Sequence, residues 1–219
     1  MLSRVNRVAR DLGVRFNLIA YRRPWEVAAE DWDRDYASGK LDFYGHFRER
    51  GRYGVLSAYL AARAAPVRLL DVGCGVGLLR GHLTGIDVAE YVGIDPSSEA
   101  IEAARKTQAS HESFHVAHLP GQAMGQFDVI VCNEVLYYIE DLPGALSRLH
   151  AALKPGGWVL TSIVRHPGDV ALQRALAAEF DTIDSVFIRR RLRPRNGWTV
   201  GCHAGKATDG TTGKNMAAE

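Results

Sequence analysis

The chain of 219 residues is long enough for one domain with a substantial core, and 47% of its residues are hydrophobic. It contains no apolar stretch near the roughly 18–20 residues that cross a bilayer, and its start lacks the apolar core of a secretory signal. Three scattered cysteines indicate reduced thiols rather than a disulfide framework or zinc site, so we expect a cytoplasmic protein. The spacing of acids and histidines indicates no bound metal.

The net charge is +2, but it is unevenly distributed. Residues 1–23 carry +5 and residues 189–206 carry +6, whereas residues 24–188 carry −8. Such runs are most often solvated faces. The arginines of 189–195 either protect a sheet edge from aggregation or bind phosphate or carboxylate groups.

Residues 1–20 place apolar side chains at helical spacing with arginines between them, which predicts a basic amphipathic helix. Four interpretations of this helix are open: it packs over the rest of the chain, it lies on a membrane surface, it binds a protein partner, or it serves as a transit peptide. Residues 25–50 are dense in aromatic and acidic side chains. We interpret residues 1–50 as an N-terminal helical lid over the following sheet, although a plain structural cap predicts the same composition.

From about residue 51 onward, helical and strand patterns alternate, which predicts an open parallel α/β sheet. The apolar run of residues 67–72 predicts a buried strand that includes Asp71, and Gly73, Gly75 and Gly77 follow it. These glycines allow a sharp turn and a close approach to a ligand, and residues 78–84 can begin a helix. A dinucleotide fingerprint would have its third glycine one place later. The acid instead suits a ligand with a cationic amino group.

A second apolar strand, in the segment YVGIDPSS, ends in Asp95, whose carboxylate can accept hydrogen bonds from both hydroxyls of a ribose. Pro96, which follows it, is a further candidate for cofactor binding. The two motifs together resemble motif I and the acidic ribose loop of the class I S-adenosylmethionine-dependent methyltransferases. The resemblance implies a doubly wound Rossmann-like sheet, mostly parallel with an antiparallel last strand. It also implies S-adenosylmethionine as cofactor, with Asp71 and the glycines at its methionine end.

The resemblance extends over about 130 residues. The segment FDVIVCNEVLYYIEDL is similar to the family's fourth strand, here residues 127–132, which implies that Asn133 lies beside the methionine moiety. A helix over 141–154, a Lys-Pro-Gly-Gly turn and a fifth strand over 158–164 follow. Where the family often has an acid near adenine, this chain has HVAHLPG, which leaves backbone groups, His118 and Leu119 for that role.

In such sheets the methyl acceptor lies beyond the carboxyl ends of the strands. The catalytic candidates are therefore His166 after the fifth strand and Glu134 and Tyr137 after the fourth. His166 has a suitable pKa for a general base, or it only caps a turn. Glu134 holds a cationic amine, deprotonates a hydroxyl or pairs with an arginine, and Tyr137 and Tyr138 stack on the acceptor or pack beneath the lid.

The C-terminal part predicts a helix over 169–180 and antiparallel strands over 185–192 and 198–203. We thus divide the chain into a lid (1–50), a methyltransferase domain (51–204) and a disordered tail (205–219). The helix over 52–62 resembles the one before the first strand in glycan- and amine-modifying methyltransferases, which implies that Tyr36, Arg52 and Tyr53 approach the cofactor.

The sequence after the fourth strand, Asn-Glu-Val-Leu, differs from the Asn/Asp-Pro-Pro-aromatic motif of enzymes that methylate DNA amino groups, so we expect no DNA substrate. We expect methyl transfer to oxygen or nitrogen of a small molecule or glycan, such as an amino or nucleotide sugar. The pattern is similar to nodulation-factor-type N-methyltransferases. The alternatives are an RNA or protein methyltransferase that docks through the basic segments, and a catalytically silent S-adenosylmethionine-binding subunit whose partner binds residues 1–20. We expect a monomer or homodimer.

Overall fold

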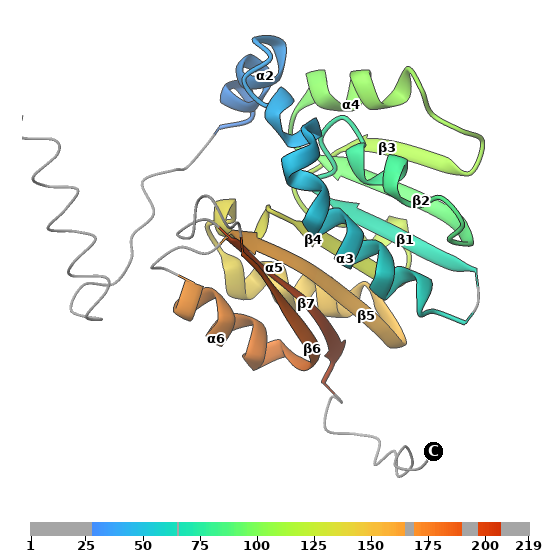
Figure 1. Ribbon diagram of the computed structural model, residues 1–219, viewed down its shortest axis with the longest axis vertical. Helices are drawn as coiled ribbons and strands as arrows, with labels where there is room; N and C mark the ends of the chain where they lie inside the picture. The colour runs from blue at the N-terminus through green and yellow to red at the C-terminus, as the bar shows by residue number, and fades with distance from the viewer. Residues whose placement is uncertain (1–27, 65, 165–168, 190–196, 207–219) are drawn as a thin grey trace, which may run out of the picture.

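The computed structural model describes residues 28–64, 66–164, 169–189 and 197–206 (Figure 1). These residues form a seven-stranded sheet in the order β3-β2-β1-β4-β5-β7-β6. Its strands are β1 (Val67–Val72), β2 (Val88–Asp95), β3 (Glu112–Val116), β4 (Phe127–Asn133), β5 (Leu153–Val164), β6 (Phe180–Arg189) and β7 (Gly197–Gly205). The first five strands pair with one another in parallel, and β7 is antiparallel to both β5 and β6. The predicted fold class is confirmed.

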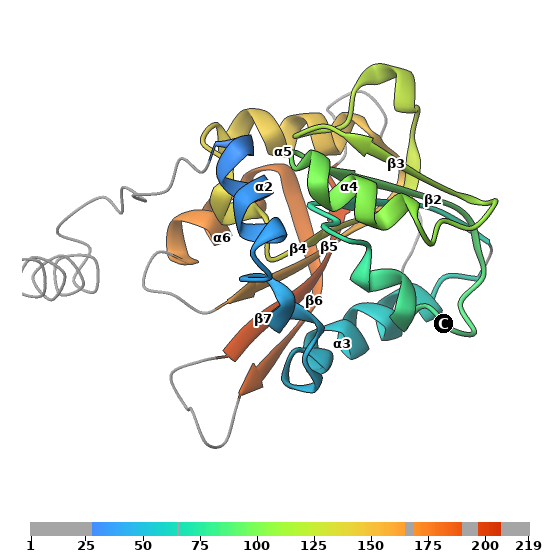
Figure 2. The same cartoon turned by 90° about the horizontal axis from the view of Figure 1, so that it is seen from above.

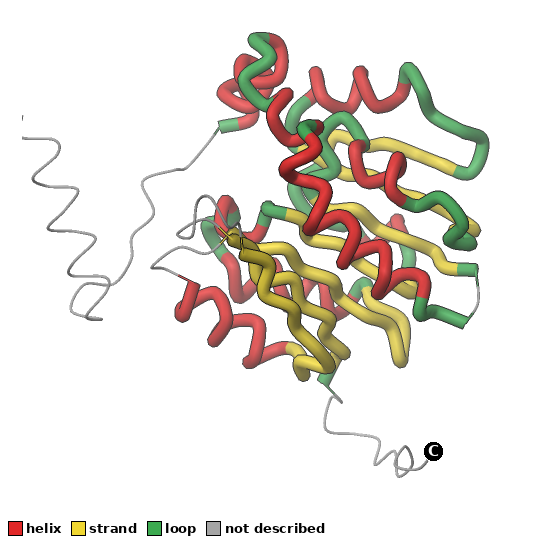
Figure 3. The backbone as a smooth tube through the Cα atoms, in the orientation of Figure 1, coloured by secondary structure: helices red, strands yellow, loops and turns green. Residues whose placement is uncertain are grey.

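Helices cover both faces of the sheet (Figures 2 and 3). The helices α3 (Arg50–Ala61) and α4 (Ser98–Arg105) pack on one face together with a 3-10 helix, Leu78–His82. The helices α5 (Leu142–Ala151) and α6 (Asp169–Glu179) pack on the other face. Buried side chains alternate between these two cores along each strand, as Leu69 and Leu70 do in β1, because successive strand residues point to opposite faces.

The N-terminal segment contributes α2 (Ala29–Ala37) and two 3-10 helices, Asp42–Gly45 and Phe47–Glu49, which precede α3. In the fold, α2 lies beside α4, at the end of the sheet where β1 and β2 end (Figure 1). The expected basic helix over 1–20 lies outside the described residues, as does most of the arginine-rich 189–195 segment. Within the described part of the chain, no helix is both long and apolar enough to cross a membrane.

Several elements differ in type or extent from those expected. The helix after the glycine turn is a short 3-10 helix, because Gly77 has φ 79° at its start and the Arg80 side chain donates a hydrogen bond to the Gly77 carbonyl. Strand β5 begins at Leu153, with the Lys-Pro-Gly-Gly segment as an irregularity in its pairing with β4. Strand β6 begins at Phe180, which is buried against α5 and α6, and β7 continues through Gly205, where the tail was expected to start.

Candidate active site

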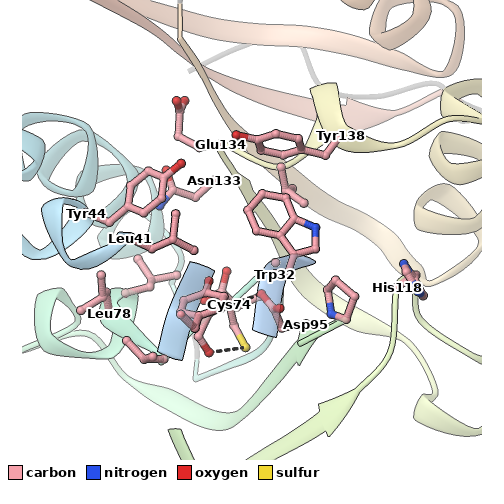
Figure 4. A pocket seen from close by; sticks show the side chains of 18 of the residues that line it. Trp32, Leu41, Tyr44, Cys74, Leu78, Asp95, His118, Asn133, Glu134 and Tyr138 are labelled. Atoms are coloured by element: carbon pink, nitrogen blue, oxygen red, sulfur yellow. Dashed lines mark hydrogen bonds between the residues drawn. The ribbon is translucent and has the colours of Figure 1, made fainter. Parts of the chain in front are cut away.

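A cavity of about 490 Å³ lies at the carboxyl ends of β1, β2 and β4. The strand order reverses between β1 and β4, and open α/β sheets bind their ligands at such a crevice. The volume is in the usual range for a small-molecule site. Its walls include side chains from the glycine turn, from the ends of the strands and from the N-terminal segment. Figure 4 labels Trp32, Tyr44, Asp95, His118, Asn133, Glu134 and Tyr138 among them, and Tyr36, Arg52 and Asp71 also line the cavity.

The glycine turn forms the floor of this cavity. The Gly73 and Cys74 amides donate to the Ile94 carbonyl at 2.8 and 3.0 Å, which ties the turn to the neighbouring strand β2. Gly73 and Gly75 have φ of 70° and 53°, in the left-handed region. A Cβ on Gly73 would lie 2.7 Å from the Val135 side chain, and one on Gly75 would lie 2.5 Å from the Tyr36 hydroxyl. Only glycine therefore fits either position.

Asp95 holds the turn and also faces the cavity. Its side chain is 95% buried, and its two oxygens accept hydrogen bonds of 2.9 Å from the amides of Gly75 and Ser97. Burial raises the pKa of Asp95, and these two amide bonds counter the shift. Each carboxylate oxygen has a second lone pair, so the group retains acceptor capacity for the paired hydroxyls of a ribose.

Asp71, at the end of β1, is 2% exposed and accepts a hydrogen bond from the Tyr91 hydroxyl. Burial raises the pKa of Asp71 to about 7, although the Tyr91 bond lowers it. A cationic group in the cavity would supply the countercharge that this carboxyl lacks.

Arg52 of α3 is 1% exposed, and it joins the N-terminal segment to the end of β4. Its guanidinium forms an ion pair with Glu49 and donates from Nε to Asn133 Oδ1 at 3.0 Å. It also lies over the rings of Tyr44, Tyr53 and Trp198, at 4.8–5.6 Å from their centroids. This network fixes the Asn133 side chain at the cavity wall.

Glu134 is the only non-glycine residue with a positive φ, 61°, among those the structure describes. Its amide donates to the Ser162 carbonyl at 2.9 Å, and its carboxyl accepts from the hydroxyls of Ser162 and Tyr137, each at 3.0 Å. Burial raises the pKa of Glu134 to about 7. A strained backbone that presents a buried acid to a cavity is typical of a functional residue.

Asp33 fastens α2 to the strand end that carries Asp95. Its carboxylate accepts from the hydroxyls of Ser97 and Ser98 at 2.6 and 3.1 Å and from the Glu99 amide at 3.2 Å. These groups form the N-terminus of α4, where a negative charge is favourable. Asp33 thereby holds Trp32 and Tyr36, which precede and follow it on α2, over the cavity.

The structure brings most of the predicted site residues together around one cavity: Asp71, Gly73, Gly75, Asp95, Pro96, His118, Leu119, Asn133 and Glu134 all line it. Gly77 and Tyr137 are not among the lining residues. Gly77 begins the 3-10 helix, and Tyr137 contacts the site through Glu134. His166 lies outside the described residues. No group of three or more metal-ligating side chains occurs in the described part of the chain.

Sequence reasoning missed two of these contributions, the Asp33 contacts with α4 and the Glu49 partner of Arg52. Glu49 and Arg52 are three residues apart, a spacing that predicts a pair on one helix, so that signal was present in the sequence. The Asp33 contacts span 64 to 66 residues and have no local signal.

The doubly wound sheet, the glycine turn and the two strand-end acids define a protein that binds a nucleoside cofactor at its switch point. Residues 44–199 match the family described as "Methyltransferase domain". The chain belongs to the class I S-adenosylmethionine-dependent methyltransferases.

Curated relatives include ubiquinone biosynthesis O-methyltransferases. The one from Albidiferax ferrireducens is 31% identical over 157 residues, which is 67% of this chain and 62% of the relative. The one from Burkholderia ambifaria is 31% identical over 59% of this chain and 57% of the relative. The chain thus spans about three fifths of the length of these relatives.

Solved structures with the same fold include the N-methyltransferase NodS from Bradyrhizobium japonicum in complex with S-adenosylhomocysteine. It has a TM-score of 0.64 at 21% identity and covers 80% of this chain and 97% of its own. A 1,6-didemethyltoxoflavin-N1-methyltransferase from Burkholderia thailandensis has a TM-score of 0.66 at 19% identity, covering 85% and 94%. At these identities the likeness shows the shared fold.

The residues present fit the family's cofactor. Gly73 and Gly75 form a cradle that a Cβ would fill, and Asp95 retains acceptor capacity toward the cavity. Asp71 is a buried carboxyl that forms no direct ion pair among the described residues. These features match a ligand that carries a ribose and a cationic amino acid.

Replacing Asp33 with alanine should make S-adenosylhomocysteine dissociate about three- to tenfold faster, because α2 loses its contacts with the N-terminus of α4. Stopped-flow dissociation measures this rate. Asp31→Ala is the matched control, since Asp31 lies on the same helix and pairs only with the exposed Arg34 in the described contacts. Equal dissociation rates for the two variants would show that the contacts of Asp33 with α4 do not slow the release of S-adenosylhomocysteine.

Proposed function

We propose that this chain transfers a methyl group from S-adenosylmethionine to an oxygen or nitrogen atom of a small molecule. The observation that carries the proposal is a single cavity with two chemically different ends. One end holds the glycine turn with Asp95, and the other holds Glu134 with Tyr44 and Tyr138 (Figure 4). Such a cavity has room for a nucleoside cofactor and for an acceptor beside it.

At the cofactor end of the cavity, Asp95 would accept hydrogen bonds from the ribose hydroxyls, and Pro96, His118 and Leu119 would contact the adenine. Asp71, Gly73 and Gly75 would hold the methionine end, and Gly77 completes the turn. Asn133, which accepts a hydrogen bond from Arg52, would bind the methionine backbone. When bound, S-adenosylmethionine supplies an electrophilic methyl group on a positively charged sulfur.

At the acceptor end, Glu134 receives the proton that the acceptor loses. A pKa near 7 suits this role, because the group is then a competent base close to neutral pH. Tyr137 is a positioning residue, since its hydroxyl holds the Glu134 carboxyl from outside the cavity lining. Trp32 and Tyr36 exclude water from the reacting atoms. A role for His166 as general base stays a prediction.

The relatives support a small-molecule acceptor and both acceptor atoms. The curated relatives are named as O-methyltransferases of ubiquinone biosynthesis, whereas NodS and the toxoflavin enzyme are named as N-methyltransferases. We also propose a glycan as one class of acceptor. Among sugars, the acid-lined cavity favours an amino sugar over a nucleotide sugar, because the phosphates of the latter would be repelled.

The alternatives of an RNA or protein methyltransferase and of a silent partner subunit depend on the basic segments at 1–23 and 189–206. These segments lie largely outside the described residues. Docking on a polyanion would make binding fall steeply with salt, since each neutralised phosphate releases counterions.

The test is a calorimetric titration with S-adenosylmethionine, S-adenosylhomocysteine and NAD in parallel, followed by methyl-transfer assays on phenols, amines and amino sugars. We expect micromolar binding of the first two ligands, no binding of NAD, and methylation in at least one acceptor class. Failure of S-adenosylhomocysteine to bind would refute the proposed function. Binding without turnover across the acceptor classes would favour the silent subunit.

A further inference from the structure

We propose that the acceptor is an amine that enters the cavity as an ammonium ion, with Glu134 as its countercharge and the rings of Trp32 and Tyr138 as its walls. This inference rests on the proposed function and names the substrate class of the same site. It distinguishes amines from the neutral phenols and the anionic sugar phosphates that the fold alone would allow.

Glu134 is a buried acid whose direct hydrogen-bond partners are neutral. Glu134 is 92% buried, and its two hydrogen-bond donors, Ser162 and Tyr137, are neutral. Among the described residues no ion pair includes it. A buried carboxylate with no countercharge is costly, and a ligand ammonium would supply that charge.

The nearest fixed cation does not fill this role. Arg52 lowers the pKa of Glu134 through its charge, yet its own hydrogen bonds go to Glu49, Asn133 and Tyr53. The guanidinium is thus held by other partners. Asp42 and Glu140 add two further acids to the cavity wall, so its described charged groups are predominantly carboxyls. An anionic acceptor would meet repulsion from these groups.

The walls around Glu134 are aromatic. Trp32 and Tyr138 form an edge-to-face pair with ring centroids 4.8 Å apart, and Tyr44 lies on the other side of Glu134 in Figure 4. Aromatic faces attract organic cations as well as apolar groups. Rings next to a carboxyl form the combination that recognises an ammonium group on an apolar or sugar body.

The backbone conformation at Glu134 sets the position of its carboxyl group. A glutamate at φ 61° is strained, and the Ser162 carbonyl and hydroxyl hold both its amide and its carboxyl in place. Since a relaxed backbone would point the side chain elsewhere, the position of the carboxyl depends on this strain.

An ammonium must lose a proton before its nitrogen has an electron pair to share. In the proposed complex, one N–H bond breaks, its electron pair stays on nitrogen, and the proton moves to a Glu134 carboxylate oxygen. The products are a neutral amine and a neutral carboxylic acid, so charge and atoms balance within the pair.

The test uses three probes of matched size that differ in charge: 2-phenylethylamine, 2-phenylethanol and phenylacetate. Each is titrated into the protein saturated with S-adenosylhomocysteine, with ligand-observed NMR as the readout. We expect the amine to bind at least tenfold more tightly than the alcohol, and phenylacetate to bind most weakly. In Glu134→Gln the preference for the amine should fall below twofold.

The matched control is Glu140→Gln, which removes the same charge from an exposed position on the cavity wall and should keep most of the preference. Circular dichroism and S-adenosylhomocysteine affinity show whether each variant is folded. If S-adenosylhomocysteine binds and the amine shows no advantage over the alcohol, the amine inference fails while the proposed function stands. A preference that survives in Glu134→Gln also overturns it.

The amine should also bind with a defined pH dependence. Glu134 is faced by Arg52 and Glu49 from the α3 side and by Tyr44, Tyr137 and Tyr138, of which Arg52 lowers its pKa and Glu49 raises it. With a Glu134 pKa near 7, ammonium binding below that pH must expel a proton. The amine's affinity should therefore rise with pH, by about tenfold per unit below pH 6 and little above pH 8, while that of the alcohol stays level. A pH-independent amine affinity would contradict the proposal.

Discussion

Replacing Asp95 with alanine is expected to weaken S-adenosylhomocysteine binding about a hundredfold, because it removes the charged acceptor that we propose for the two ribose hydroxyls. Hydrogen bonds to charged groups contribute about 1.5–3 kcal/mol each, and two at the lower end of this range correspond to a loss of about a hundredfold. The substitution also removes the acceptor of the Gly75 and Ser97 amides, which shape the glycine turn and the start of α4. Isothermal titration measures the change in affinity.

Asp128→Ala is the matched control for Asp95. Asp128 is a half-buried acid near the opposite end of the sheet, where it pairs with Lys154 and accepts from the Arg68 amide. Its loss should alter stability and leave cofactor affinity within about twofold. If both variants bind S-adenosylhomocysteine equally well, the ribose does not contact Asp95 and the cofactor lies elsewhere in the cavity.

Replacing Arg52 with methionine is expected to destabilise the fold by about 3–5 kcal/mol, which corresponds to a Tm lower by about 6–20 °C. The cause is that the buried Glu49 carboxyl loses the positive charge of Arg52. The aromatic rings around the guanidinium also lose their cation, and Asn133 loses its donor. Calorimetric unfolding of the variant measures the change.

A second variant separates the charge from the packing. In Glu49→Gln/Arg52→Met both charges are absent, so much of the lost stability should return. A double variant as unstable as the two single variants combined would show that Glu49 and Arg52 act independently. A single variant that unfolds within 1 °C of the parent would show that the buried ion pair contributes nothing.

The sequence by itself determined the sheet and its cofactor end. The apolar run before Asp71, the glycine spacing and the strand ending in Asp95 are local patterns, and strand and helix periodicity extends through the body of the chain. Because carboxyl ends of parallel strands meet at one edge, these motifs predicted that Asp71 and Asp95 share a cavity, and they do. The sequence predicted the ends of the elements less accurately. Strand β6, expected from residue 185, begins at Phe180, because this side chain packs in the core.

Only the tertiary structure decided how residues 28–50 attach to the sheet and how the cavity wall around Glu134 is built. Asp33 reaches Ser97 across 64 residues, and Arg52 reaches Asn133 across 81. The left-handed backbone of Glu134 is held by Ser162, 28 residues away. Such long-range contacts produce no periodic pattern in the sequence. Each forms only when packing of the core brings two distant segments of the chain together.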